Sequence, residues 1–232
     1  MPLLFNTPPL NVYEQMALDE TLVRMRAGEI TLRLYHWITG AAATFGYAQN
    51  VAQVRRGAQE RAFGGSLCRR PTGGGLVYHE DDLTFSLIFP SQDKPSEIYR
   101  QLHAAVQAAL VLSGVRTTVF AQKTSPAAYA PSQQNQASAC FTNPVENDLL
   151  RADGQKMLGG AIRRFGNTVL YQGSLQLPQA RENAVYKQAI INAVRGFLNV
   201  DLKIEPLAIS ALEQAKQLAR TQYQSAAWLE KF

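Results

Sequence analysis

The sequence predicts an α/β fold in which a mixed, largely antiparallel sheet is flanked by helices. Short segments rich in β-branched and aromatic residues are separated by longer segments whose apolar residues recur at helical spacing. The expected strands or strand edges span residues 30–37, 41–47, 67–68, 76–78, 82–89, 115–120, 148–150, 156–158 and 168–177. The expected helices span residues 11–27, 51–62, 95–112, 182–198 and 209–232. Ala152-Asp153-Gly154 is typical of a hairpin turn, so the strands on either side of it should run antiparallel.

Glycines mark several ends of these elements. Gly28 is expected to end the first helix and Gly114 the helix over residues 95–112. A turn at Gly40 should return the chain so that the second strand pairs with the first. His36, on the first strand, and His103, on the third helix, are expected to be structural.

Length and composition describe an ordinary globular protein. The chain has 232 residues, 46% of them hydrophobic and 18% charged, which suits one large domain or two small ones. No internal repeat, signal peptide or apolar run of membrane-spanning length is present, so we expect a cytoplasmic protein without a membrane span. Two cysteines, Cys68 and Cys140, are too few for a disulfide framework or a zinc site.

The charge of the chain says little about its partners. The net charge is +5, but the basic residues form neither a tail nor a stripe with interleaved aromatics. Nucleic acid is therefore not expected as a partner, since such binding concentrates positive charge on one face. An acidic protein or a phosphorylated carrier explains the mild excess equally well.

The most informative run is Arg69-Arg70-Pro71-Thr72-Gly73-Gly74-Gly75-Leu76-Val77-Tyr78-His79. Consecutive glycines let backbone N–H groups turn toward one point and let a ligand approach the main chain. The two guanidinium groups offer planar donors to carboxylate or phosphate oxygens. Because strand edges flank the run, we expect it to face a pocket, with His79 as a ligand contact.

A second informative stretch follows a polar, proline-broken segment over residues 124–138, which is expected to be a mobile surface loop. This segment leads to Cys140, which is either a small buried residue or a nucleophile that accepts an acyl group from a thioester. Lys156 begins the returning strand of the hairpin, just before Gly159 and Gly160. In this position its ammonium can lie near a carbonyl or phosphate oxygen, although a lysine that starts a strand is usually solvated.

Together these motifs resemble the biotin/lipoate protein ligase and octanoyltransferase superfamily. The first run resembles its Arg-Arg-Pro-Thr-Gly-Gly-Gly-x-Val-x-His signature, and residues 156–163 resemble its Lys-x-x-Gly-x-Ala-x-Arg signature. Met16-Ala17-Leu18-Asp19-Glu20, Gly46-Tyr47-Ala48-Gln49 and Gln172-Gly173-Ser174-Leu175 resemble further family segments. The resemblance implies the fold of that catalytic domain and an elongated apolar pocket. The residues it implies for acyl or acyl-adenylate binding are Arg70, Thr72, Gly73, Gly74, Gly75, His79, Gly159, Gly160 and Ala161.

The resemblance leaves two enzymatic hypotheses. In the first, the chain moves an octanoyl or lipoyl group from an acyl carrier protein to one lysine of an apo lipoyl domain without a cofactor. Cys-Phe-x-x-Pro-x-x-x-Asp-Leu resembles the cysteine-dependent branch, in which Cys140 carries the acyl group and Lys156 polarises its carbonyl. In the second, the chain is an ATP-dependent lipoate ligase in which Asn147 and Asp148 hold the nucleotide and magnesium. Gly160 stands where the ligases commonly carry serine.

Two further expectations concern the whole chain. A non-catalytic member of the superfamily that binds a lipoylated carrier is a third hypothesis, from a different functional class. The sequence suggests a single catalytic domain, because no residues remain for the C-terminal accessory domain of many lipoate ligases. That feature modestly favours the transferase.

Overall fold

The computed structural model describes residues 1–38, 40–122 and 144–232. Within these ranges the main sheet has eight strands, and the three at one end are parallel while all the others pair antiparallel. The expected mixed, largely antiparallel sheet is therefore confirmed. In spatial order the strands are β11 (Lys203–Pro206), β1 (Leu3–Asn6), β2 (Thr31–Leu34), β6 (Leu83–Pro90), β10 (Thr168–Leu175), β9 (Lys156–Phe165), β8 (Leu149–Leu150) and β7 (Thr118–Val119).

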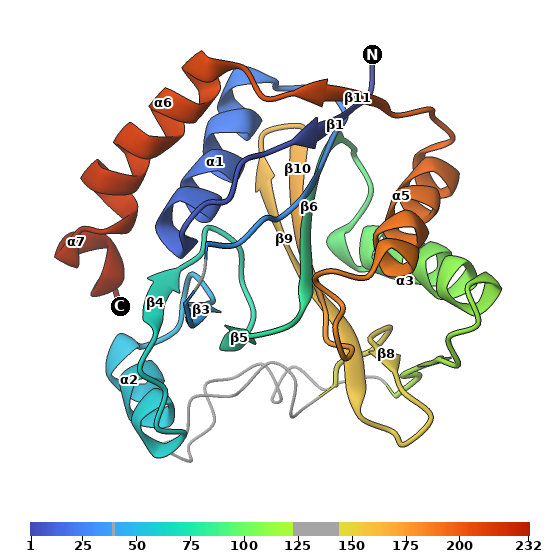
Figure 1. Cartoon of the computed structure of the whole chain (residues 1–232), viewed down its shortest axis with the longest axis horizontal. Helices are drawn as coiled ribbons and strands as arrows, with labels where there is room; N and C mark the ends of the chain where they lie inside the picture. The colour runs from blue at the N-terminus through green and yellow to red at the C-terminus, as the bar shows by residue number, and fades with distance from the viewer. Residues whose placement is uncertain (39, 123–143) are drawn as a thin grey trace.

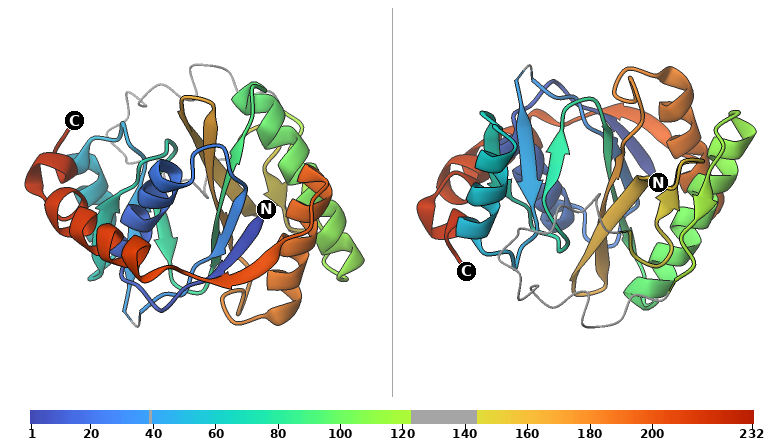
Figure 2. Two further views of the ribbon diagram at one scale, coloured as in Figure 1. Left: turned by 90° about the horizontal axis from the view of Figure 1, so that it is seen from above. Right: turned by 90° about the horizontal axis from the view of Figure 1, so that it is seen from below.

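Helices cover both faces of this sheet (Figures 1 and 2). On one face lie α1 (Val12–Met25) and α6 (Ile209–Leu218), and on the other lie α3 (Pro95–Leu112) and α5 (Ala184–Leu198). Alternate residues of the central strands serve the two cores: Leu87 of β6 packs on the α3 and α5 side, and its neighbour Ile88 packs on the α1 and α6 side. Cover on both faces explains why β6 and β10 are buried along almost their whole length.

A second, three-stranded sheet lies beside the first, close to α2 (Val51–Glu60). Its central strand β3 (Ala42–Phe45) runs parallel to β4 (Ser66–Arg69) and antiparallel to β5 (Val77–His79). The expected pairing of segment 41–47 with segment 30–37 is therefore wrong. Both edges of β2 are already occupied, by β1 and by β6, so β3 has to find partners elsewhere.

Helix ends follow the local chemistry of the sequence. The side-chain oxygen of Asn11 accepts backbone N–H groups of the first turn of α1, and the carboxylate of Glu14 accepts the backbone N–H of Asn11. The expected final helix is broken into α6, the π-helical turn η1 (Ala219–Tyr223) and α7 (Ala226–Leu229), which Ser225 caps. The break follows from that cap, because the Ser225 side chain accepts the N–H of Trp228 and starts a new helix.

Three other differences between the expected and the observed elements concern short strands. The strand expected at residues 115–120 is reduced to β7, and the parallel strands β1 and β11 were not anticipated. Residues 124–138 and Cys140 lie outside the described part of the chain.

Among the helices that are described, none combines the length and the apolar character needed to span a membrane.

Candidate functional site

Arg69 is structural, and it was not among the residues that the family resemblance implied for acyl binding. Its side chain is fully buried, and its guanidinium donates hydrogen bonds to four backbone carbonyl oxygens. Two of these carbonyls belong to Tyr47 and Gln49, and two belong to Trp228 and Leu229 near the C-terminus. Arg69 therefore fastens the C-terminal turn to the back of the glycine loop.

Arg70 holds the glycine loop from inside. Its guanidinium donates to the carbonyl oxygen of Thr44 at 3.1 Å and to the carbonyl oxygen of Gly73 at 2.5 Å. The side chain is 5% exposed and also lines a cavity. Part of its donor capacity is thus used to shape the loop, while the same group faces the space that the loop encloses.

The loop packs closely on the segment that follows β3. A Cβ atom built on Gly46 would lie 1.9 Å from the carbonyl oxygen of Gly74, which has a left-handed φ of +86°. The side-chain oxygen of Gln49 accepts the N–H of Gly46 at 3.0 Å. The Gly-x-x-Gln motif therefore has a physical role: the glycine admits the loop and the glutamine holds the glycine.

A buried polar network fixes Thr72, whose hydroxyl donates to the side-chain oxygen of Gln172 at 2.6 Å. The amide nitrogen of Gln172 donates to Asp19 at 2.7 Å and to the Tyr35 hydroxyl at 3.1 Å. Asp19 forms a fully buried ion pair with Arg33. In the sequence, Asp19 and Gln172 stood out only as members of family-like segments. The alternation of β10 was the signal that could have found Gln172, because it places this residue with Leu170 on the face of the sheet that α1 covers.

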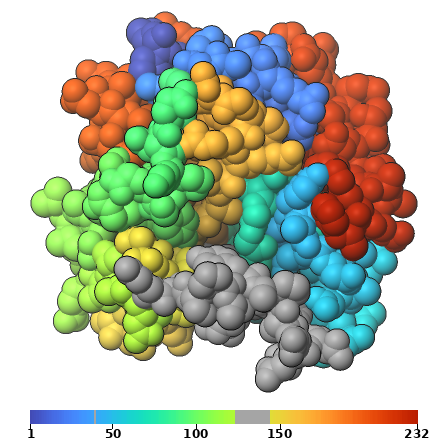
Figure 3. Space-filling view, turned by 180° about the vertical axis from the view of Figure 1, so that it is seen from behind, coloured from blue at the N-terminus to red at the C-terminus, as the bar shows by residue number. Residues whose placement is uncertain are grey.

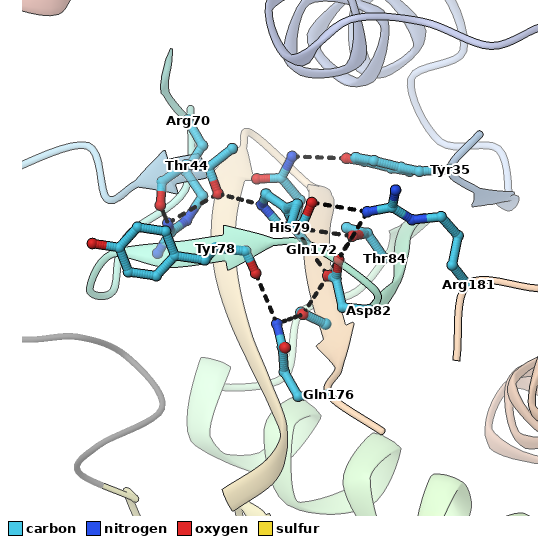
Figure 4. Close-up of polar contacts among 11 residues, drawn as sticks. Tyr35, Thr44, Arg70, Tyr78, His79, Asp82, Thr84, Gln172, Gln176 and Arg181 are labelled. Atoms are coloured by element: carbon cyan, nitrogen blue, oxygen red, sulfur yellow. Dashed lines mark hydrogen bonds and ion pairs between the residues drawn. The ribbon is translucent and has the colours of Figure 1, made fainter. Parts of the chain in front are cut away.

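His79 is held between a carboxylate and a hydroxyl (Figure 4). Its Nδ1 lies 2.9 Å from Asp82, and its Nε2 lies 2.9 Å from the hydroxyl of Thr44. Burial opposes ionisation of Asp82, but the adjoining His79 and hydrogen bonds from Ser174 and Thr84 outweigh it and lower the pKa of that carboxyl. The Asp82 carboxylate therefore accepts from Nδ1–H, while Nε2 shares a hydrogen bond with the Thr44 hydroxyl.

The other two histidines are structural, as expected. His36 lies 2.8 Å from the carbonyl oxygen of Thr7 through Nδ1. His103 is buried in α3 between the carbonyl oxygen of Asn147 and the hydroxyl of Tyr171. Neither is among the residues that line the cavity.

Lys156 is buried rather than solvated. Its ammonium lies 2.7 Å from Asp148, and the exposed fractions of the two side chains are 2% and 0%. A Cβ atom on Gly159 would lie 2.4 Å from Cε and 2.6 Å from Nζ of Lys156, so the lysine occupies the space that a side chain at position 159 would need. This explains the glycine three residues after the lysine.

The loop and the lysine strand meet at one cavity, which holds about 400 Å³ of space between atoms, part of it open to solvent. Of the predicted residues, Arg70, His79, Gly159, Gly160 and Ala161 line it. Thr72, Gly73, Gly74, Gly75 and Lys156 lie outside its lining. Eight residues that had not been assigned to the site also line it: Met16, Tyr35, Thr44, Val77, Thr84, Gln172, Gly173 and Ser174.

The two walls of the cavity come from distant parts of the sequence. Arg163 of β9 donates to the carbonyl oxygen of Pro71 at 3.0 Å, so the loop and β9 are in contact, and a Cβ atom on Gly74 would lie 3.9 Å from Cβ of Ala161. Viewed from behind, the teal surface around residues 70–80 lies beside the amber surface of β9 and β10 (Figure 3). Apolar groups with a few convergent polar side chains are typical of a small-molecule site.

Similar proteins point to one family. A model described as the lipoyl protein ligase A/B catalytic domain matches residues 11–189. Octanoyltransferase LipM of Staphylococcus epidermidis is 28% identical over 97% of this chain and 96% of that protein. LipM of Staphylococcus aureus is 31% identical over 73% of this chain and 63% of that protein.

Solved structures agree on the fold. Lipoate-protein ligase A bound with ATP has a TM-score of 0.74 at 21% identity, covering 99% of this chain and 98% of that one. The bipartite lipoate protein ligase of Thermoplasma acidophilum, described with its E2 lipoyl domain, has a TM-score of 0.72 at 19% identity, with coverages of 99% and 95%. At these identities the likeness supports the fold alone.

Proposed function

This chain belongs to the lipoyl protein ligase A/B catalytic domain family, and from that premise we propose that it is an octanoyltransferase that modifies lipoyl-domain proteins. The LipM relatives support transfer of an octanoyl group by an enzyme of this kind. The observation that carries the proposal is the contact between the glycine loop and β9 around one cavity, with the buried ammonium of Lys156 lying against Gly159, which lines that cavity.

The reaction divides into two acyl transfers. In the first, the thiolate of Cys140 attacks the thioester carbonyl of an octanoyl-carrier protein, so that a C–S bond to the enzyme forms as the C–S bond to the carrier breaks. The carrier leaves as a thiolate, which takes a proton from solvent. In the second, the ε-amine of a lipoyl-domain lysine attacks the enzyme thioester, an amide forms and Cys140 is released as a thiol.

Specific residues have separate roles in this scheme. Lys156 supplies the positive charge that stabilises the oxyanion of each tetrahedral intermediate. Arg70 and Thr72 hold Gly73–Gly75 in the shape that cradles the acyl group. His79, Gly159, Gly160 and Ala161 contact the acyl chain. Cytoplasmic thiols remain reduced, so we place a reaction that depends on a free thiol in that compartment.

The ligase alternative assigns Asp148 to magnesium, and the donors around Asp148 disfavour this assignment. One carboxylate oxygen accepts the Tyr99 hydroxyl at 2.5 Å, and the other faces Lys156 and the N–H of Val145, each at 2.7 Å. Magnesium would have to displace these donors, because it requires direct or water-mediated oxygen ligands in near-octahedral geometry.

The decisive experiment uses mass spectrometry and two cysteine variants. The enzyme is incubated with octanoyl-carrier protein and then with an apo lipoyl domain, without ATP. The wild type and Cys68→Ala should form an octanoyl adduct and modify the domain, whereas Cys140→Ala should do neither. Cys68 is a matched control, because burial raises the pKa of its thiol and keeps it from acting as a nucleophile.

Other outcomes point to the other hypotheses. Full transfer by Cys140→Ala would end the thioester mechanism, and modification that requires ATP and free lipoate would indicate a ligase. Saturable binding of the lipoyl domain without turnover under either donor would indicate a non-catalytic carrier-binding protein.

A further inference from the structure

The ion pair of Lys156 and Asp148 does not stand alone. Both side chains are almost completely removed from water, so each polar atom needs a protein partner. The N–H of Val145 donates to the same Asp148 oxygen that faces the ammonium, at 2.7 Å. The second carboxylate oxygen accepts the hydroxyl of Tyr99 at 2.5 Å.

Tyr99 reaches this carboxylate from α3, on the opposite side from the glycine loop. Its hydroxyl also accepts the N–H of Gly160 at 3.0 Å, and Gly160 lines the cavity. The Tyr99 oxygen therefore bridges two groups: the Asp148 carboxylate, which holds the lysine, and the backbone N–H of Gly160 in the cavity wall. Any displacement of the phenol changes both distances together.

The surroundings of Tyr99 fix its ring and keep its proton. The ring lies 3.9 Å from the His103 imidazole, measured between centroids, and 6.4 Å from the Tyr171 ring. Burial and the nearby charge of Asp148 raise the pKa of Tyr99 well above its ordinary value, so at neutral pH the hydroxyl keeps its proton and donates it to Asp148. His103 and Tyr171 bond to each other at 2.7 Å, which holds the ring stack in place.

We propose that Tyr99 is a positioning residue, which acts through Asp148 to hold the Lys156 ammonium at a fixed place beside the cavity wall. The proposal rests on the proposed function, because it assigns to Tyr99 the placement of the charge that acts on the acyl carbonyl. Tyr99 itself does not touch the substrate. Its effect on catalysis should therefore become much smaller when Asp148 can no longer hold the lysine as an ion pair.

The first test does not depend on activity. Tyr99→Phe removes one hydroxyl and keeps the ring, and the lysines are then labelled with an amine-reactive reagent at fixed pH and mapped by mass spectrometry. The labelling rate of Lys156 is divided by that of the exposed Lys94 in the same sample. This ratio should be about tenfold higher in Tyr99→Phe than in the wild type, because a factor of about ten corresponds to the loss of one hydrogen bond to a charged group. Tyr186→Phe, a half-buried tyrosine on α5 outside this network, is the matched control.

The second test measures the first acyl transfer. Tyr99→Phe should lower kcat about tenfold and leave KM for the octanoyl donor within about twofold, because the acyl chain keeps its contacts. In an Asp148→Asn background the same substitution should have a much smaller further effect, since only the bond from the Gly160 N–H is then left to lose. Urea unfolding verifies that each variant is folded.

The outcomes separate this inference from the proposed function. Unchanged Lys156 labelling in folded Tyr99→Phe overturns the positioning role, and so does a full tenfold loss of kcat in the Asp148→Asn background. A wild-type enzyme that transfers no octanoyl group overturns the proposed function, while the labelling result still decides the role of Tyr99.

Discussion

His103 should make the protein lose stability as the pH falls below neutrality. Burial lowers the pKa of this histidine to about 3, with a smaller contribution in the same direction from Lys156. Its Nδ1 lies 2.8 Å from the carbonyl oxygen of Asn147, which only accepts, and its Nε2 lies 2.7 Å from the Tyr171 hydroxyl. The folded state therefore holds a neutral imidazole with its proton on Nδ1.

The sign and size of the effect follow from linkage. The pKa of His103 in the folded protein lies below its value of about 6.5 in the unfolded chain. Between these two pKa values the unfolded state binds a proton and the folded state does not. The stability contribution is thus fully present above about pH 6.5 and declines as the pH falls toward 3. At pH 5 the imidazole of the unfolded chain lies about 1.5 pH units below its pKa, which corresponds to a loss of about 2 kcal/mol.

Urea unfolding of the wild type and His103→Gln at pH 7.5 and pH 5.0 measures this loss. The glutamine amide keeps a donor and an acceptor but does not titrate in this range. The free energy of unfolding should fall by about 2 kcal/mol more in the wild type than in the variant between the two pH values. The remaining histidines are common to both proteins and cancel. Equal pH dependence in the two proteins would refute the neutral, buried imidazole.

Three further substitutions test the packing of the site. Gly46→Ala should displace the glycine loop, because the new Cβ overlaps the carbonyl oxygen of Gly74, and kcat/KM for octanoyl transfer should fall at least about tenfold; wild-type kinetics would contradict this. Gly160→Ala places a Cβ 2.3 Å from the Tyr171 hydroxyl and should lower the free energy of unfolding by about 1–3 kcal/mol in urea titrations, with no change as the opposing result. Arg33→Met strips a fully buried carboxylate of its ion-pair partner and should cost about 3–5 kcal/mol at neutral pH, whereas a loss under about 1 kcal/mol would show that the pair is dispensable.

Local signals in the sequence were sufficient for most elements. The helix over residues 95–112 has the predicted bounds, because its apolar spacing, Pro95 and Gly114 all act within a few residues. The hairpin around Gly154, which has a left-handed φ of +82°, also formed as predicted. Strand partners were less accessible: β3 joins a second sheet because β1 and β6 occupy both edges of β2.

The candidate site shows the same division. The two signatures identified the loop and the lysine strand, and the structure brings Gly74 against Ala161. The family resemblance assigned Arg70 and not Arg69 to acyl binding, but the residues themselves gave no physical reason, since adjacent residues of identical chemistry differ only in direction. In the structure Arg69 points to the C-terminal turn and Arg70 points to the cavity. The role proposed for Cys140 stays a prediction, as that residue lies outside the described chain.

The sequence by itself determined the family, the fold class and the two peptides that meet at the cavity, because glycine runs, turn residues and periodic apolar positions are local properties. Only the tertiary structure decided which polar groups form hydrogen bonds within the protein and which remain to contact a ligand. Asp148 is an example: its neighbours in sequence suggested a nucleotide site, whereas Lys156 from β9 and Tyr99 from α3 surround it in space. The physical reason is that a buried polar atom bonds to whatever donor the fold places within about 3 Å, and that donor is set by the packing of distant segments.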